Sequence, residues 1–134
     1  MILLDSGYLV ALINTRDELH ARAKAWLRVL RGPLIVTEYV LVEMMDTLSH
    51  PSLRIGAHGM YRLLTSSPEI TVVAASSSLL RCGVELHHRR PDKDWSLTDC
   101  ISFAVMEERR ITQALAFDSH FQQAGYEPLL RRDP

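Results

Sequence analysis

Four acidic side chains have the clearest capacity for chemistry in this sequence: Asp5, Glu43, Asp99 and Asp118. Asp5 and Asp118 each follow a short apolar run typical of a buried strand, whereas Glu43 and Asp99 fall within helical patterns. Carboxylates that converge at one edge of a sheet repel each other unless cations are bound. A set of oxygen donors without His or Cys selects hard ions, so we expect Mg²⁺ or Mn²⁺ rather than zinc.

Each of these acids also has a simpler structural interpretation. Asp5 and Asp118 are both followed by serine, and either one could cap the helix that follows it. Glu43 could be a solvated position on a helix. For any single acid the structural interpretation is preferred, and it is the expected convergence of all four that favours a metal site.

Asp99 lies in the stretch "WSLTDCISFAVM", where two interpretations compete. Ser96 followed by an acid three residues later resembles a capping box, and an acid in the first turn suits the helix dipole. Helical spacing also places Asp99 on the face of Phe103 and Met106, which packs inward. An acid on that face needs a partner, so both interpretations stay open.

The spacing of apolar residues predicts the strands and helices that position these acids. Short apolar runs predict buried strands at residues 2–4, 34–36, 70–73 and 114–117. Amphipathic patterns predict helices at 20–30, 37–48, 57–64 and 79–86, with a further helix beginning near Asp99. Alternation of strands and helices predicts an α/β fold, a three-layer sandwich around a parallel β-sheet. Sites in such sheets form beyond the carboxyl ends of the strands.

Composition indicates a compact chain. With 134 residues, 47% of them apolar and 23% charged, we expect a single domain over residues 1–134. No run of residues approaches a membrane span and no signal peptide is evident, so a cytoplasmic protein that does not associate with membranes is expected. Cys82 and Cys100 fall among apolar residues of predicted helices, which predicts buried free thiols.

Several segments of the sequence, in order, resemble the PIN-domain ribonucleases, and most closely the VapC-type toxins of bacterial toxin–antitoxin pairs. They are "MILLDSGYLVALI", "TEYVLVEMMDTL", "DKDWSLTDCISFAVM" and "ALAFDSHFQQAGYEPL". The most specific are "SLTDCISFAVM" and "AFDSHFQQAG", whereas "LLDSG" alone would mean little. The match covers nearly the whole chain. The one departure is Gly7, where many relatives have another small polar residue.

The resemblance implies a PIN-like parallel-sheet fold and a Mg²⁺-dependent endoribonuclease that hydrolyses RNA phosphodiester bonds. The family's catalytic and metal-binding acids fall on Asp5, Glu43, Asp99 and Asp118, and its small hydroxyl residue falls on Ser6. The resemblance also implies a homodimer and a cognate antitoxin that covers the site. Such hydrolysis fits carboxylate-held divalent ions, which activate water and neutralise the leaving oxygen.

RNA binding requires positive charge near the acids. Setting the four acids aside leaves 12 acidic residues against 15 basic ones, a mild excess. The cluster "HHRRPDK" at 87–93 precedes the Asp99 helix, and Arg109 and Arg110 end it. These residues form either a phosphate-contacting rim or a solvated helix end that suits the dipole.

Alternative functions come from three classes. A receiver-like phosphoacceptor would require a second acid beside Asp5 and a lysine after a late strand, and the sequence has neither. A nuclease-inactive PIN fold acting as a binding module would be expected to lose some of the four acids. A PIN nuclease that works in RNA turnover rather than as a toxin stays open.

Overall fold

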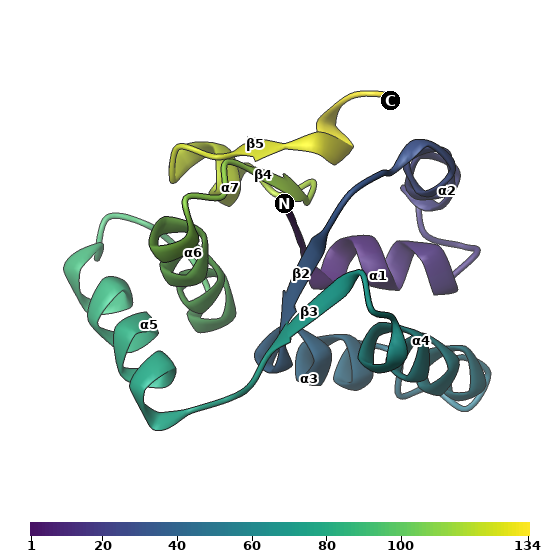
Figure 1. Cartoon of the computed structure of the whole chain (residues 1–134), viewed down its shortest axis with the longest axis horizontal. Helices are drawn as coiled ribbons and strands as arrows, with labels where there is room; N and C mark the ends of the chain where they lie inside the picture. The colour runs from purple at the N-terminus through teal and green to yellow at the C-terminus, as the bar shows by residue number, and fades with distance from the viewer.

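A computed structural model describes residues 1–134, and its centre is a five-stranded, all-parallel sheet (Figure 1). The strand order across the sheet is β3-β2-β1-β4-β5. The strands span Ile2–Leu4 (β1), Leu34–Thr37 (β2), Ile70–Val73 (β3), Gln113–Leu115 (β4) and Glu127–Pro128 (β5). Because β1 lies between β2 and β4, the first acid of the sequence emerges at the middle of the sheet.

Helices cover both faces of this sheet. They span Ser6–Ile13 (α1), His20–Val29 (α2), Glu38–Thr47 (α3), Arg54–Ser66 (α4), Ser77–Arg89 (α5), Leu97–Arg109 (α6) and Ser119–Gln123 (α7), followed by a 3₁₀ turn, Leu129–Arg131 (η1). Figure 1 shows α1 to α4 on one side of the sheet and α6 on the other, with α5 packed outside α6. None of the helices combines the length and the apolar composition that crossing a bilayer requires.

Alternation along the strands divides the buried side chains between two cores. Leu3 and Ile35 point toward α6 and α7, whereas Leu4 and Val36 point toward α1 to α4. All four side chains are almost fully buried. A strand buried on both faces reads as a continuous apolar run, which explains why "ILL" and "LIV" identified β1 and β2.

The predicted three-layer α/β fold is confirmed, with local differences. The strand predicted at 114–117 ends at Leu115, so two residues separate β4 from Asp118. Strand β3 is an edge strand and only half-buried, and β5 is too short to give a sequence signal. Cys100 is buried as predicted, but Cys82 is exposed because α5 packs on α6 and leaves its outer face to solvent.

The contact between α5 and α6 positions the helix that carries Asp99, and it depends on Gly83. A Cβ atom added at Gly83 would lie 2.3 Å from Cγ1 of Ile101. We therefore expect Gly83→Ala to destabilise the protein by about 1 to 2 kcal/mol in urea unfolding, since overpacking outweighs the gain in helix propensity. Gly59→Ala in α4 is the matched control. It meets nothing within 4 Å and should be stabilising by about 0.5 to 1 kcal/mol. Equal gains from both substitutions would contradict the packing argument.

Candidate active site

A cavity of about 570 Å³ opens at the carboxyl ends of β1 and β4, and all four predicted acids line it. Two further acids, Asp17 and Asp94, lie in its wall. Only two lining side chains, His120 and Arg131, carry or accept positive charge. The structure therefore brings together the four residues that are separated by up to 113 positions in the sequence, in a strongly acidic environment.

Asp5 is the most enclosed of these acids, with 8% of its surface exposed. Its backbone N–H donates to the carbonyl of Leu115 at 3.2 Å, which fixes the end of β1 against β4. Burial, together with the charges of Asp99, Glu43 and Asp118, raises the pKa of Asp5 from 3.8 to about 7, although a hydrogen bond from the Ser6 backbone opposes this. Asp5 occupies the N-cap position of α1, but its side chain makes no capping hydrogen bond. The capping interpretation of Asp5 is therefore wrong.

Glu43 reaches the cavity from α3, where Thr37 caps the helix by accepting from the N–H of Val40. The hydroxyl of Ser6 donates to Oε1 of Glu43, and this hydrogen bond links the start of α1 to α3. Glu43 is thus held by a specific partner rather than free in solvent. The interpretation as a plain solvated position does not describe it.

Asp99 satisfies both interpretations of its sequence context. Its Oδ2 accepts from the Ser96 N–H at 3.3 Å while its own N–H donates to Ser96 Oγ at 3.0 Å, which completes the capping box of α6. The same side chain lines the cavity, and only 14% of it is exposed. The inward face predicted for this helix is confirmed by the burial of Phe103 and Met106.

Asp118 caps α7, since its Oδ1 accepts from the His120 N–H at 3.0 Å. The capping interpretation is correct for this residue, and its half-exposed carboxylate also lines the cavity. Because the cap leaves part of the carboxylate free, the two roles are compatible.

His120 lies among the acids of this cavity, although nothing in the sequence pattern singled it out. Its Nδ1 lies 2.9 Å from Asp99 Oδ2 and 3.4 Å from Asp118 Oδ1, and its Nε2 lies 3.1 Å from Asp94 Oδ1. Burial lowers the pKa of His120, but the hydrogen bond with Asp99 and the three neighbouring carboxylates outweigh this and raise it overall. The only available signal was its place two residues after Asp118 in "FDSHF".

The oxygen donors in the cavity suit a hard divalent cation, but these donors are not closely grouped. No group of three or more His, Cys, Asp or Glu side chains is placed closely enough to hold one metal ion. The pKa of Asp5 is raised mainly by burial and further by the charges of Asp99, Glu43 and Asp118, and a bound cation would offset both effects. Oxygen donors of this kind bind Mg²⁺ with several retained waters, so an ion need not contact every carboxylate.

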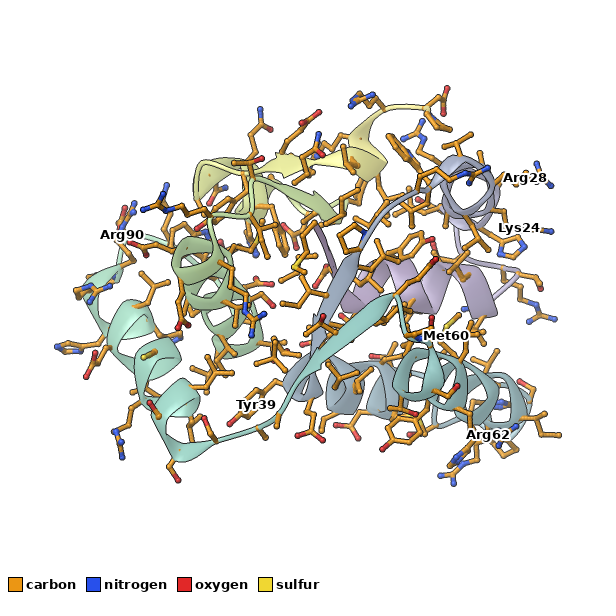
Figure 2. All side chains as sticks on the ribbon, viewed as in Figure 1. Lys24, Arg28, Tyr39, Met60, Arg62 and Arg90 are labelled. Carbon is orange, nitrogen blue, oxygen red and sulfur yellow. The ribbon has the colours of Figure 1, made fainter.

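The basic cluster at residues 87–93 does not line this cavity. Arg90 pairs with Asp92 at 3.0 Å, and its guanidinium lies 5.0 Å from the ring centroid of Trp95. Figure 2 shows Arg90 at the outer edge of the molecule, near the end of α5. These contacts favour the solvated helix end over the phosphate-contacting rim.

Comparison with known proteins identifies the family to which the chain is similar. The family model described as "PIN domain" matches residues 2–126. A curated relative, the 23S rRNA-specific endonuclease VapC20 of Mycobacterium tuberculosis strain H37Rv, is 30% identical over 129 residues. The alignment covers 94% of this chain and 95% of that relative, and VapC20 of strain CDC 1551 matches equally well.

Two solved structures share the fold. The crystal structure of Mycobacterium tuberculosis VapC20, titled a sarcin–ricin loop cleaving toxin, superimposes with a TM-score of 0.88 at 26% identity. The superposition covers 96% of this chain and 98% of the VapC20 chain. FitAcB from Neisseria gonorrhoeae gives a TM-score of 0.67 at 16% identity, over 96% of this chain and 99% of that one, and supports the fold alone.

Proposed function

Because this chain belongs to the PIN-domain family, as an endoribonuclease of the VapC toxin type, we propose that its acidic cavity is a Mg²⁺-binding active site. Nucleases of this family depend on divalent metal ions, and Mn²⁺ suits the same donors. The proposed ligands and catalytic residues are the four acids described above: Asp5, Glu43, Asp99 and Asp118. The observation that carries the proposal is that one cavity collects all four, with Asp5 nearly buried among them.

The protein's own contribution is to hold these carboxylates in place. Ser6 fixes Glu43, the capping box and His120 fix Asp99, and the cap of α7 fixes Asp118. A bound divalent ion supplies an activated water and neutralises charge on the leaving oxygen. No nucleophilic side chain is needed, because water would be the nucleophile in such hydrolysis. Ser6 donates a hydrogen bond to Glu43 and serves to position it.

VapC toxins act on RNA and pair with antitoxins. The names of the relatives lead us to propose the sarcin–ricin loop of 23S rRNA as the first substrate to test. We further propose a homodimer, whose interface would cover apolar side chains that α3 and α4 expose, including Val42, Tyr61 and Leu63. An antitoxin that inhibits this protein would have to deny RNA access to the acidic cavity.

The metal requirement has a direct test. We expect purified protein to cleave 23S rRNA, or total RNA, in Mg²⁺ or Mn²⁺, and EDTA to abolish the activity because the four carboxylates then lack their counter-ion. Since water is the expected nucleophile, the products should carry 5′-phosphate and 3′-hydroxyl ends. End mapping of the fragments measures both points in one experiment.

Two outcomes would contradict the proposal. Undiminished cleavage in excess chelator would exclude the metal mechanism. Products ending in a 2′,3′-cyclic phosphate would mean that the ribose hydroxyl attacks, and the carboxylates would then need another role. Zn²⁺ serves as the ion control, since it should support cleavage poorly where the four proposed ligands are all carboxylate oxygens.

A further inference from the structure

Phe117 departs from the rule that phenylalanine is buried in this protein. Phe103 and Phe121 are almost fully enclosed, whereas Phe117 is 41% exposed. Phe117 is the only aromatic side chain in the wall of the acidic cavity, and it directly precedes Asp118. The ring is thus only partly packed against the protein, and its exposed part borders the cluster of carboxylates.

The backbone around Phe117 is held firmly. The N–H of Leu130 donates to the carbonyl of Ala116 at 3.1 Å, and Nε of Arg131 donates to the carbonyl of Phe117 at 2.7 Å. The guanidinium carbon of Arg131 also lies 4.7 Å from the ring centroid of Phe117. Arg131 therefore covers one face of the ring and leaves the rest of it exposed. A ring that is fixed in this way loses little conformational entropy when a flat group stacks on it.

Phe117 and Leu19 form a ridge between two hollows. One is the acidic cavity, and the other, of about 470 Å³, is lined by Ala21, Arg22 and Ala25 of α2 together with Glu18 and Asp133. Arg22 pairs with Asp133 at 3.1 Å, so this hollow is of mixed charge. The α2 sequence "HARAKAWLRV" contains three basic residues and no acid. Figure 2 shows two of them, Lys24 and Arg28, extending from the outer side of α2. A chain that leaves the acidic cavity over Phe117 thus crosses this hollow before it reaches the positive charges of Lys24 and Arg28 on the outer side of α2.

We propose that Phe117 is a stacking platform for the RNA base that flanks the scissile phosphate, and that the RNA strand continues from it over α2. The inference rests on the proposed function, because it places the phosphate at the acids. Asp118 and Phe117 are adjacent, with Cα atoms about 3.8 Å apart, so a nucleotide next to the scissile bond lies within reach of the ring. Unstacked bases of single-stranded RNA bind in this way to aromatic and arginine side chains.

An RNA occupant fits this ridge better than a protein segment does. The acidic cavity on one side and the basic helix on the other suit a polymer whose backbone is negative and whose cleavage site is held through cations. An apolar protein anchor would instead find a cavity with only two apolar lining residues, Leu19 and Phe117. Contact with an antitoxin is therefore the alternative that the experiment must separate.

The test uses a fluorescein-labelled single-stranded oligoribonucleotide that spans the mapped cleavage site. A non-hydrolysable linkage replaces the scissile phosphodiester, so its binding is measured by anisotropy in Mg²⁺ without cleavage. We expect Phe117→Leu to weaken binding by about 5- to 100-fold and Phe117→Trp to restore it, since stacking on a ring is lost and then regained. Leu80→Ala is the control, because Leu80 is an apolar side chain that is 39% exposed on α5 and lies outside the cavity. It should leave binding unchanged.

An abasic series locates the stacked base. Each position of the oligonucleotide is replaced in turn by an abasic nucleotide. At one position beside the cleavage site, the abasic change should weaken binding to the parent protein as much as Phe117→Leu does. Combining that abasic change with Phe117→Leu should then cause no further loss. Fully additive losses at every position would overturn the stacking assignment.

A separate binding experiment tests whether the RNA strand continues over α2. The double variant Lys24→Gln with Arg28→Gln should bind more weakly and with a shallower salt dependence, because two phosphate contacts are lost. Arg62→Gln on α4 is the control, since Figure 2 places Arg62 at the lower edge of the molecule, away from Lys24 and Arg28 on α2. Equal losses from the control and the double variant would overturn the path.

The remaining outcomes separate this inference from the proposed function. Parent protein that neither binds nor cleaves RNA overturns both. Parent protein that cleaves RNA with a KM that Phe117→Leu leaves unchanged overturns the stacking platform and leaves the nuclease assignment standing. Normal RNA binding by Phe117→Leu, combined with lost inhibition by the antitoxin, would assign the ring to a protein contact instead.

Discussion

Asp99→Asn is expected to reduce RNA cleavage by more than about 100-fold while changing the stability of the metal-free protein by less than about 1 kcal/mol. The loss of activity follows from removing one charged oxygen of the proposed metal site beside Asp5. Replacement of even an outer partner of a metal ligand costs about 10- to 100-fold. The stability change is small because two effects oppose each other. A first-turn charge and the pairing with His120 are lost, but repulsion of the Asp5 carboxylate is relieved.

Ser96→Ala separates the two roles of Asp99, because it removes the other half of the capping box and leaves the carboxylate in place. It should cost about 1 kcal/mol of stability and keep most of the cleavage activity. Thermal unfolding with and without Mg²⁺ completes the comparison. Mg²⁺ should stabilise the parent and Ser96→Ala, but Asp99→Asn much less, since binding stabilises only the state that binds. An Asp99→Asn protein that resembles Ser96→Ala in both assays would leave Asp99 as a helix cap alone.

The sheet and most helices were predictable from sequence, because the hydrophobic periodicity and the residues that begin or end each element agree there. Buried runs such as "ILL" and "LIV" identify strands that are covered on both faces, and Ser96 identifies the start of α6 through its hydrogen-bonding chemistry. The convergence of the acids was predictable for a topological reason. Parallel strands end at one edge of a sheet, so Asp5 and the residues after β4 had to meet there.

What the sequence could not supply depends on contacts between distant residues. The role of His120 follows from carboxylates on α6 and on the preceding loop, and neither is near it in sequence. The exposure of Phe117 was not predicted, because "ALAF" is one continuous apolar run in the sequence. The strand itself ends at Leu115, two residues before Phe117. Edge strands such as β5, with two residues, carry no periodicity at all.

Asp5 should make the metal-free protein lose stability as the pH rises, which is the reverse of the usual behaviour of a paired carboxylate. Its pKa is raised from 3.8 to about 7 by burial and by the neighbouring acids. The folded state therefore binds a proton that the unfolded state has already released between those values. Stability contributed by the protonated form is fully present below about pH 4, falls through the interval, and is lost above about pH 7. The total loss is a few kcal/mol, at most about 4.

Asp5→Asn should abolish this slope, because an amide does not titrate. In EDTA, urea unfolding of the variant and the parent should nearly coincide at pH 4, and the variant should be the more stable protein at pH 8. Asp46→Asn removes an exposed carboxylate of α3 and should keep the parent slope. Adding Mg²⁺ at pH 8 should restore stability to the parent but not to Asp5→Asn, since only the parent has the charged ligand to neutralise. Parallel pH profiles for Asp5→Asn and the parent in EDTA would mean that Asp5 is charged at neutral pH without cost, and the electrostatic case for a cation at this cavity would fail with it.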